Sequence, residues 1–294
     1  MLLRLLPFAF VLFWSTGFIA AKYGLPYAGP YTFLAARFIL VLIMLAVIVV
    51  LFKSRLPNNK ASYFHLFVVG MTVQVMYLGG VFSAIKLGLP AGITAVIVGM
   101  QPILTAFIIH RFSSLSVIIT TIVGFLGLLL VVIDFGAWQS GLTRQLETNV
   151  DWLMYVPSLI ALFGITFGTL YQKKFCADVP VIVNAFIQFI PTCVVFIILA
   201  FLFEAEPSIQ IDWHPNFMLA LLWSVIVLSI VSILLMNLLY QHNSASSAAS
   251  YFYLTPPVAL VMSYFLFDET ISVLNFIGIA LVVVSVYMSN KLKL

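Results

Sequence analysis

The chain has 294 residues, of which 64% are hydrophobic and only 7% are charged, and its formal net charge is +4. A water-soluble domain carries about 25% charged residues, so this composition excludes an ordinary soluble protein and predicts a protein that crosses a membrane several times. The small positive charge does not indicate nucleic-acid binding, because the basic residues follow the membrane topology described below.

The apolar runs are long enough for ten spanning helices, since each helix needs about 20 apolar residues. Strands of a membrane barrel would be about ten residues long with alternating polarity, so the predicted fold class is an all-α integral membrane protein. In chain order the predicted spans are 3–23, 30–52, 62–86, 90–110, 114–134, 152–173, 180–203, 217–241, 244–267 and 271–290.

The loop charges predict the orientation of these spans. If the N-terminus is cytoplasmic, nine of the 13 basic residues fall in inner loops or at the termini, and all acidic residues except Asp178 fall outside. Lys and Arg accumulate on the cytoplasmic side of membrane proteins. We therefore expect both the N-terminus and the C-terminus to be cytoplasmic.

The longest outer loop divides the spans into two groups of five. When Pro102 is set against Pro256, Gly124 falls on Gly278, because each glycine follows its proline by 22 residues. Five is an odd number, so the second group must enter the membrane from the opposite side. Such inverted repeats are typical of secondary transporters, although a channel or scaffold is an alternative. The predicted units are a first repeat at 1–135, a periplasmic linker loop at 136–151 and a second repeat at 152–294.

Three stretches resemble EamA-type proteins of the drug/metabolite transporter superfamily: FWSTGFIAAKYGLPYAGPYTFLAARF, GTLYQKKF and TPPVALVMSYFLFDETISVLNFIGIALVVVSV. The resemblance implies ten helices, a multi-pass location in the bacterial cytoplasmic (inner) membrane, and movement of small metabolites such as amino acids. The third stretch carries Glu269 after its prolines. The matching position of the first half is Leu115, so that half lacks the acidic residue of the pattern.

Polar side chains inside a bilayer are costly, which makes them functional candidates. Most of them fall in the third, fourth, eighth and ninth spans, so the pathway is predicted there. For Trp14 the alternative is ordinary packing, and for Gln188 it is a bond between helices. The predicted substrate-binding or pathway residues are Trp14, Arg37, Gln74, Tyr77, Gln101, Thr105, Gln188, Asn237, Tyr240, Tyr251 and Thr255.

Prolines interrupt the fourth and ninth spans. Pro102, Pro256 and Pro257 free backbone carbonyls next to polar side chains, so we predict bends at a central cavity where the two halves pivot. A static kink is the alternative. The fifth and tenth spans carry glycines and few polar residues, which indicates that they serve as a scaffold or a dimer seam. The expected oligomeric state is a monomer or a weak homodimer.

Together with the resemblance, these patterns favour a secondary transporter that exports amino acids or related small metabolites, or lets them flow down their gradient, by alternating access. The alternative is a channel or scaffold, or a carrier of other small metabolites or drugs. No HExxH motif or acidic pair at membrane depth indicates an enzyme, and the sequence indicates no cofactor and no metal. The expected partners are a small-molecule substrate and the lipid bilayer. All acidic residues and histidines lie in loops or at span ends, so a facilitator fits at least as well as a proton antiporter.

Overall fold

In the computed structural model, every regular element among the described residues is helical and none is a strand. The described residues are 2–87, 94, 97–101, 104–105, 108, 115–139, 153, 155–206, 209–242, 251–267 and 273–291. The α-helices are α1 (Leu2–Gly24), α2 (Pro30–Leu51), α3 (Lys60–Val69), α4 (Gly80–Lys86), α7 (Leu115–Gln139), α8 (Tyr155–Phe175), α9 (Val181–Phe203), α10 (Pro215–Trp223), α11 (Ile233–His242), α13 (Thr255–Phe267) and α14 (Val273–Lys291).

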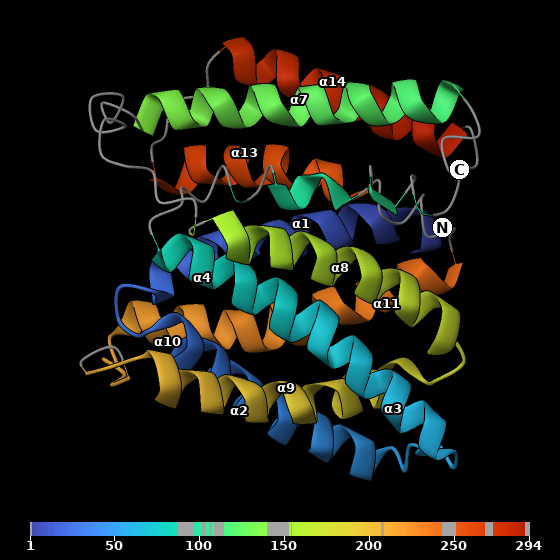
Figure 1. Cartoon of the computed structure of the whole chain (residues 1–294), viewed down its shortest axis with the longest axis vertical. Coiled ribbons are helices and arrows are strands. Elements are labelled where there is room, and N and C mark those ends of the chain that lie inside the picture. Colours follow the sequence, from blue (N-terminus) through green and yellow to red (C-terminus); the bar gives the residue numbers. More distant parts are fainter. Residues whose placement is uncertain are drawn as a thin grey trace.

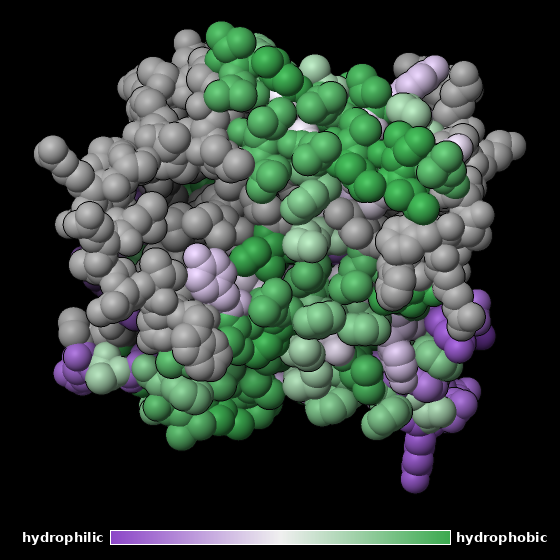
Figure 2. Space-filling view, turned by 45° about the horizontal axis from the view of Figure 1, so that its top comes forward, coloured by the Kyte–Doolittle hydropathy of each residue, from purple (hydrophilic) through white to green (hydrophobic). Residues whose placement is uncertain are grey.

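Several of these helices have the length and composition of membrane spans. Four qualify among the described residues: Pro30–Leu51, Lys60–Ala84, Val181–Phe203 and Pro215–Leu239. Figure 2 shows hydrophobic side chains over much of the coloured surface, with hydrophilic side chains gathered toward two edges. The prediction of an all-α membrane protein is confirmed. The count of ten spans stays a prediction, and most of the predicted span 90–110 lies outside the described residues.

Two of the long helices contain a π-helical middle section. The section η1 (Gly70–Gly79) joins α3 to α4, and η4 (Ser224–Ser232) joins α10 to α11. The alignment that sets Pro102 against Pro256 also sets Gly70 against Ser224, the first residues of the two sections. π-Helical turns are rare, and those that occur are often at functional sites. Because the two sections begin at matching positions of the two halves, the space between them is a candidate functional site.

The helices pack in recurring pairs (Figure 1). α2 lies against α9, η1 against α8, and α1 against α10 and η4. The contact of α2 with α9 is aromatic: the ring of Phe38 lies 5.0 Å from that of Phe189, nearly at a right angle, and 5.6 Å from that of Phe196. The first turn of α1 and the last turn of α14 lie at the same end of the bundle.

α7 and α14 form a layer of their own at one side of the molecule (Figure 1). Their close approach depends on glycine, because a Cβ atom at Gly127 would lie 2.8 Å from the carbonyl oxygen of Gly278. The hydroxyl of Ser285 on α14 donates to the carbonyl of Thr120 on α7 at 2.7 Å. Small residues at a helix contact allow this kind of packing in membranes.

Candidate functional site

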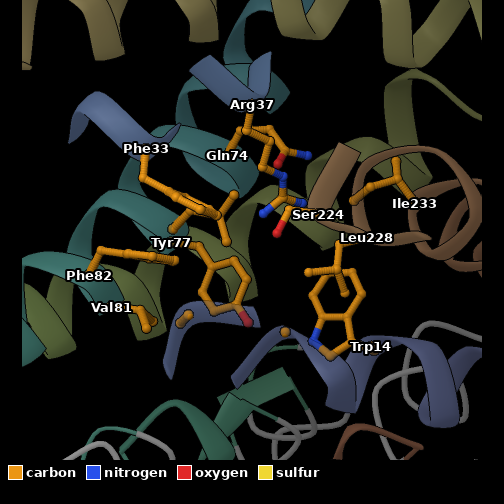
Figure 3. Close-up of a pocket in the computed structure, with 13 residues that line it drawn as sticks. Trp14, Phe33, Arg37, Gln74, Tyr77, Val81, Phe82, Ser224, Leu228 and Ile233 are labelled. Atoms are coloured by element: carbon orange, nitrogen blue, oxygen red, sulfur yellow. The ribbon is translucent and has the colours of Figure 1, made fainter. Parts of the chain in front are cut away.

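A cavity of about 70 Å³ lies between the two predicted repeats. It is bounded by α1, α2, η1 and α4 from the first half and by η4 and α11 from the second (Figure 3). This volume is well below the ~300–1,000 Å³ of typical ligand pockets, so binding of a metabolite requires side chains or helices to move. Four of the residues predicted from the sequence line it: Trp14, Arg37, Gln74 and Tyr77.

Arg37 is the one cation among the residues that line this cavity, and its side chain is only 5% exposed. Its place about two turns into α2 puts it deep in the bundle. Its Nε donates to the hydroxyl of Ser229 at 2.5 Å, and that hydroxyl donates to the carbonyl of Ser224 at 3.0 Å. The arginine of one half is therefore held by η4 of the other half, and its guanidinium faces the cavity near Ser224 (Figure 3).

Two further polar side chains reach the cavity without a partner. Gln74 is 2% exposed and Ser224 is 1% exposed, and both line the cavity. Within the described part of the chain, Nε2 of Gln74 and Oγ of Ser224 make no hydrogen bond. Buried polar groups are almost always hydrogen-bonded, so these two atoms indicate a position for water or a ligand.

The other wall of the cavity is aromatic. The rings of Trp14 and Tyr77 are nearly parallel, with centroids 6.2 Å apart, and Trp14 meets Phe252 edge-on at 5.3 Å. The neighbouring Ser15 donates to the carbonyl of Thr255 at 3.1 Å. These contacts tie α1 to the middle of the ninth predicted span, so movement of that span would displace Trp14.

Other predicted site residues lie in a second polar cluster that does not line this cavity. Gln101 donates to Thr169 at 3.4 Å, and Gln172 donates to Asn237. This cluster joins the fourth predicted span to α8 and α11. Thr169 and Gln172 were not predicted, although their three-residue spacing places them on one helix face.

Gln188 lies at the contact of α9 with η1, away from the cavity. Its amide donates to Asn184 four residues earlier. The backbone is tightly packed there, because a Cβ at Gly70 would lie 2.5 Å from the carbonyl oxygen of Gln188. Thr192 donates to the carbonyl of Gly70 at 3.4 Å. In this conformation Gln188 contributes to the contact between helices.

The remaining predicted residues are placed only in part. Thr105 is buried with its hydroxyl unpartnered among the described residues, and Tyr251 is half-buried. Tyr240 belongs to α11, but its side chain lies outside what the structure describes, as does the whole of Pro102.

The proline pair stands at a change of helix type. Pro256 and Pro257 are the second and third residues of α13, directly after the 3₁₀ turn η5 (Tyr251–Leu254). Proline is tolerated in the first turn of a helix, because the N–H it lacks would have no partner there. A hinge at this point stays a prediction.

One end of the bundle, called here the Glu204 end, is closed by contacts between the two halves. The carboxylate of Glu204 is 8% exposed and accepts from the backbone N–H groups of Tyr31 and Thr32 at 2.5 and 3.0 Å, and from the Thr32 hydroxyl at 2.6 Å. It thus satisfies the free N–H groups at the start of α2. Nearby, the rings of Tyr27 and His214 stack at 4.6 Å.

The opposite end, called here the His65 end, has a smaller set of contacts between the halves. Nδ1 of His65 and the hydroxyl of Tyr171 are hydrogen-bonded at 2.6 Å. The ring of His65 also stacks on that of Phe175 at 4.6 Å. Polar and aromatic contacts therefore join the halves at both ends, with the cavity between them.

A helical membrane bundle with a buried, partly polar cavity between its two parts has the architecture of a secondary transporter. The model of the EamA-like transporter family matches the chain twice, at residues 3–138 and at 152–291. The chain belongs to this family, whose members are transporters of the drug/metabolite transporter superfamily and not enzymes. The described residues contain no group of three or more His, Cys, Asp or Glu side chains that could hold a metal ion.

The similar proteins are transporters at low sequence identity. The uncharacterized transporter YvbV of Bacillus subtilis is 25% identical over 95% of this chain and 88% of its own length. A probable amino-acid metabolite efflux pump of Salmonella typhimurium is 23% identical over 95% of this chain and 91% of its own length. A probable amino-acid metabolite efflux pump of Escherichia coli is 24% identical over 95% of this chain and 91% of its own length.

A solved crystal structure has the same overall fold. It superposes with a TM-score of 0.76 and covers 98% of this chain and 97% of its own. The two sequences are 16% identical, so the likeness concerns the fold alone.

Proposed function

We propose that this protein is a secondary carrier of the bacterial cytoplasmic membrane. It exports amino acids or related small metabolites, or lets them flow down their gradient, by alternating access. The observation that carries the proposal is the position of the cavity: it lies between the two halves, and Arg37 of one half is bonded to Ser229 of the other. A solute bound there contacts both halves, so its binding can be coupled to their relative movement.

The packing of the helices supports an inverted repeat. If α1 corresponds to α8 and η1 to η4, then the contact of η1 with α8 and the contact of η4 with α1 are equivalent. α2 and α9 occupy equivalent positions in the two halves, as do α7 and α14. The two helices of each of these pairs also pack on each other. The double match of the family model agrees with this division. The first turn of α1 and the last turn of α14 lie at one end of the bundle, which supports termini on the same side of the membrane.

The two sets of end contacts supply the two gates that alternating access requires. Release of the Glu204 contacts, with the His65 contacts intact, opens the cavity toward the predicted outside. Release of the His65 contacts, with the Glu204 contacts intact, opens the cavity toward the predicted cytoplasmic side. The second polar cluster around Gln101 and Asn237 provides hydrogen-bonding groups along the route. The names of the Salmonella and Escherichia coli relatives support amino-acid metabolites as the substrate class.

The test is counterflow of amino acids in proteoliposomes. Vesicles that contain the purified protein and a high internal concentration of one unlabelled amino acid are expected to accumulate the same labelled amino acid transiently, with saturation. Protein-free vesicles are the control. We expect Gln101→Ala and Tyr251→Ala to lower the rate while the protein stays folded in detergent. Flux without saturation or counterflow would indicate a channel and contradict the proposal.

A further inference from the structure

The guanidinium of Arg37 is held in a way that leaves one edge available. Its Nε is occupied by Ser229 at 2.5 Å. Within the described part of the chain its two terminal nitrogens make no hydrogen bond, and Figure 3 shows the group facing the cavity. Two parallel N–H donors at a fixed spacing match the two oxygens of a carboxylate.

The neighbouring polar atoms reinforce this preference. The unpartnered Nε2 of Gln74 is a donor only, and the unpartnered hydroxyl of Ser224 can also donate. None of the thirteen residues that line the cavity is acidic. A buried cation without a counter-charge is costly, so the cavity favours a ligand that brings a negative charge.

The cavity also limits what else the ligand can be. A phosphate ester carries more negative charge than one guanidinium neutralises, and no Lys or second Arg lines the cavity. Trp14, Phe33 and Phe82 supply apolar surface beside the polar side. The chemistry therefore matches one carboxylate attached to a small apolar body. A substrate ammonium group would meet no carboxylate among these lining residues.

We propose that Arg37, Gln74 and Ser224 bind the carboxylate of a small monocarboxylate, and that this group rather than an α-ammonium is what the cavity recognises. The inference rests on the proposed function and names its substrate class. Its consequence is specific: 2-hydroxy acids bind about as well as the matching amino acids, whereas amino-acid amides, which keep the ammonium and lose the carboxylate, bind at least tenfold more weakly.

The experiment measures ligand-dependent thermal unfolding of the purified full-length protein in detergent, because a bound ligand raises the midpoint. One probe series consists of L-alanine, L-lactate and L-alaninamide. The other consists of L-leucine, 2-hydroxy-4-methylpentanoate and L-leucinamide, so that size is tested separately from charge. We expect the amino acid and the hydroxy acid of at least one series to raise the midpoint at millimolar concentration, and the amide to have no effect.

Variants assign the effect to the cavity. Arg37→Gln is expected to weaken binding of both acids at least tenfold, and Arg37→Lys to weaken it less, because lysine keeps the charge but not the paired donors. Arg55→Gln removes a guanidinium from an exposed loop and is the matched control. If Arg37→Gln does not fold, Gln74→Leu and Ser224→Ala serve, each with an expected loss of about threefold to tenfold.

The inference is overturned if no acid of either series shifts the midpoint, if the amides shift it as much as the acids, or if the Arg37 variants bind the acids normally. Counterflow tests the proposed function separately. Acid binding without counterflow supports the carboxylate site and contradicts the carrier. Counterflow that the amide inhibits as well as the acid supports the carrier and contradicts the carboxylate site.

Discussion

α2 and α9 occupy matching places in the two halves and pack against each other, but they differ in what their polar side chains do. Arg37 of α2 reaches across to Ser229 and faces the cavity. Gln188 of α9 bonds to Asn184 of its own helix, away from the cavity. The π-helical sections differ in the same way, since Gln74 of η1 is matched by Leu228 in η4. The repeat keeps the arrangement of helices, while each half has its own polar chemistry.

The largest expected effect separates Arg37 from Gln188. We expect Arg37→Gln to lower the counterflow rate tenfold to a hundredfold, because a hydrogen-bonded charge contributes about 1.5–3 kcal/mol. We expect Gln188→Leu to change the rate of the folded protein less than threefold. It should instead lower stability by about 1–3 kcal/mol, because Oδ1 of Asn184 loses its buried donor. Equal losses of transport in the two variants would show that both halves supply binding groups.

The next comparison concerns the first residues of the two π-helical sections. Gly70→Ala would place a Cβ 2.5 Å from the backbone carbonyl of Gln188, and such overpacking costs about 1–3 kcal/mol. Ser224→Ala removes a hydroxyl that has no partner among the described residues, so the unfolding midpoint should not fall. Thermal unfolding in detergent checks both. A stable Gly70→Ala protein would mean that η1 and α9 can separate at little cost.

The third comparison concerns the two ends of the bundle. Glu204→Gln removes the charge that stabilises the start of α2, a contribution of about 0.3–2 kcal/mol. We expect it to shift the equilibrium toward opening at the Glu204 end. A cysteine at Val81, which lines the cavity, should then react several-fold faster with a membrane-impermeant maleimide added from that side.

This labelling needs a low background. Cys193 is replaced by alanine, while burial raises the pKa of the Cys176 thiol to about 11, so little reactive thiolate forms at neutral pH. His65→Ala is the opposite control and should slow labelling from the Glu204 side. If both variants change the labelling in the same direction, the two ends do not open alternately.

The smallest expected effect concerns the prolines. Because Pro256 lies in the first turn of α13, its replacement by alanine should leave stability nearly unchanged. If the prolines act as hinges, the Pro102→Ala, Pro256→Ala double variant should lower the counterflow rate by about twofold to fivefold. Full transport in that variant would favour a static kink.

Composition and the length of the apolar runs were sufficient to predict the fold class, because only helices and closed barrels satisfy the backbone inside a membrane and the runs are too long for barrel strands. The rule that polar side chains at membrane depth are functional candidates also predicted four residues that line the cavity together: Trp14, Arg37, Gln74 and Tyr77. Depth, however, does not give the direction in which a side chain points. On α9 the polar residues Asn184, Gln188 and Thr192 follow one another at four-residue steps and therefore share a face. The sequence does not say what that face contacts, so the place of Gln188 depended on tertiary packing.

Ser224 and Glu204 were not predicted as contributors to the site, and the reason differs from that for Gln188. Ser224 is one serine among many, and its importance depends on η4 turning it toward Arg37. Glu204 was assigned to a loop from its position in the chain, which is consistent with its place just after α9. Its burial results from the start of α2 in the other half of the sequence, and a contact so distant leaves no local pattern.

The lone charge of Arg37 has an electrical consequence. If the cavity changes sides around it, a positive charge moves through part of the membrane field, and one charge crossing 100 mV corresponds to about 2.3 kcal/mol. A bound hydroxy acid cancels that charge, so its translocation step is insensitive to voltage. A bound zwitterionic amino acid leaves the charge in place. In a full cycle the empty carrier takes the charge of Arg37 back, so export of a hydroxy acid moves one net negative charge across the membrane, whereas export of a zwitterionic amino acid moves none.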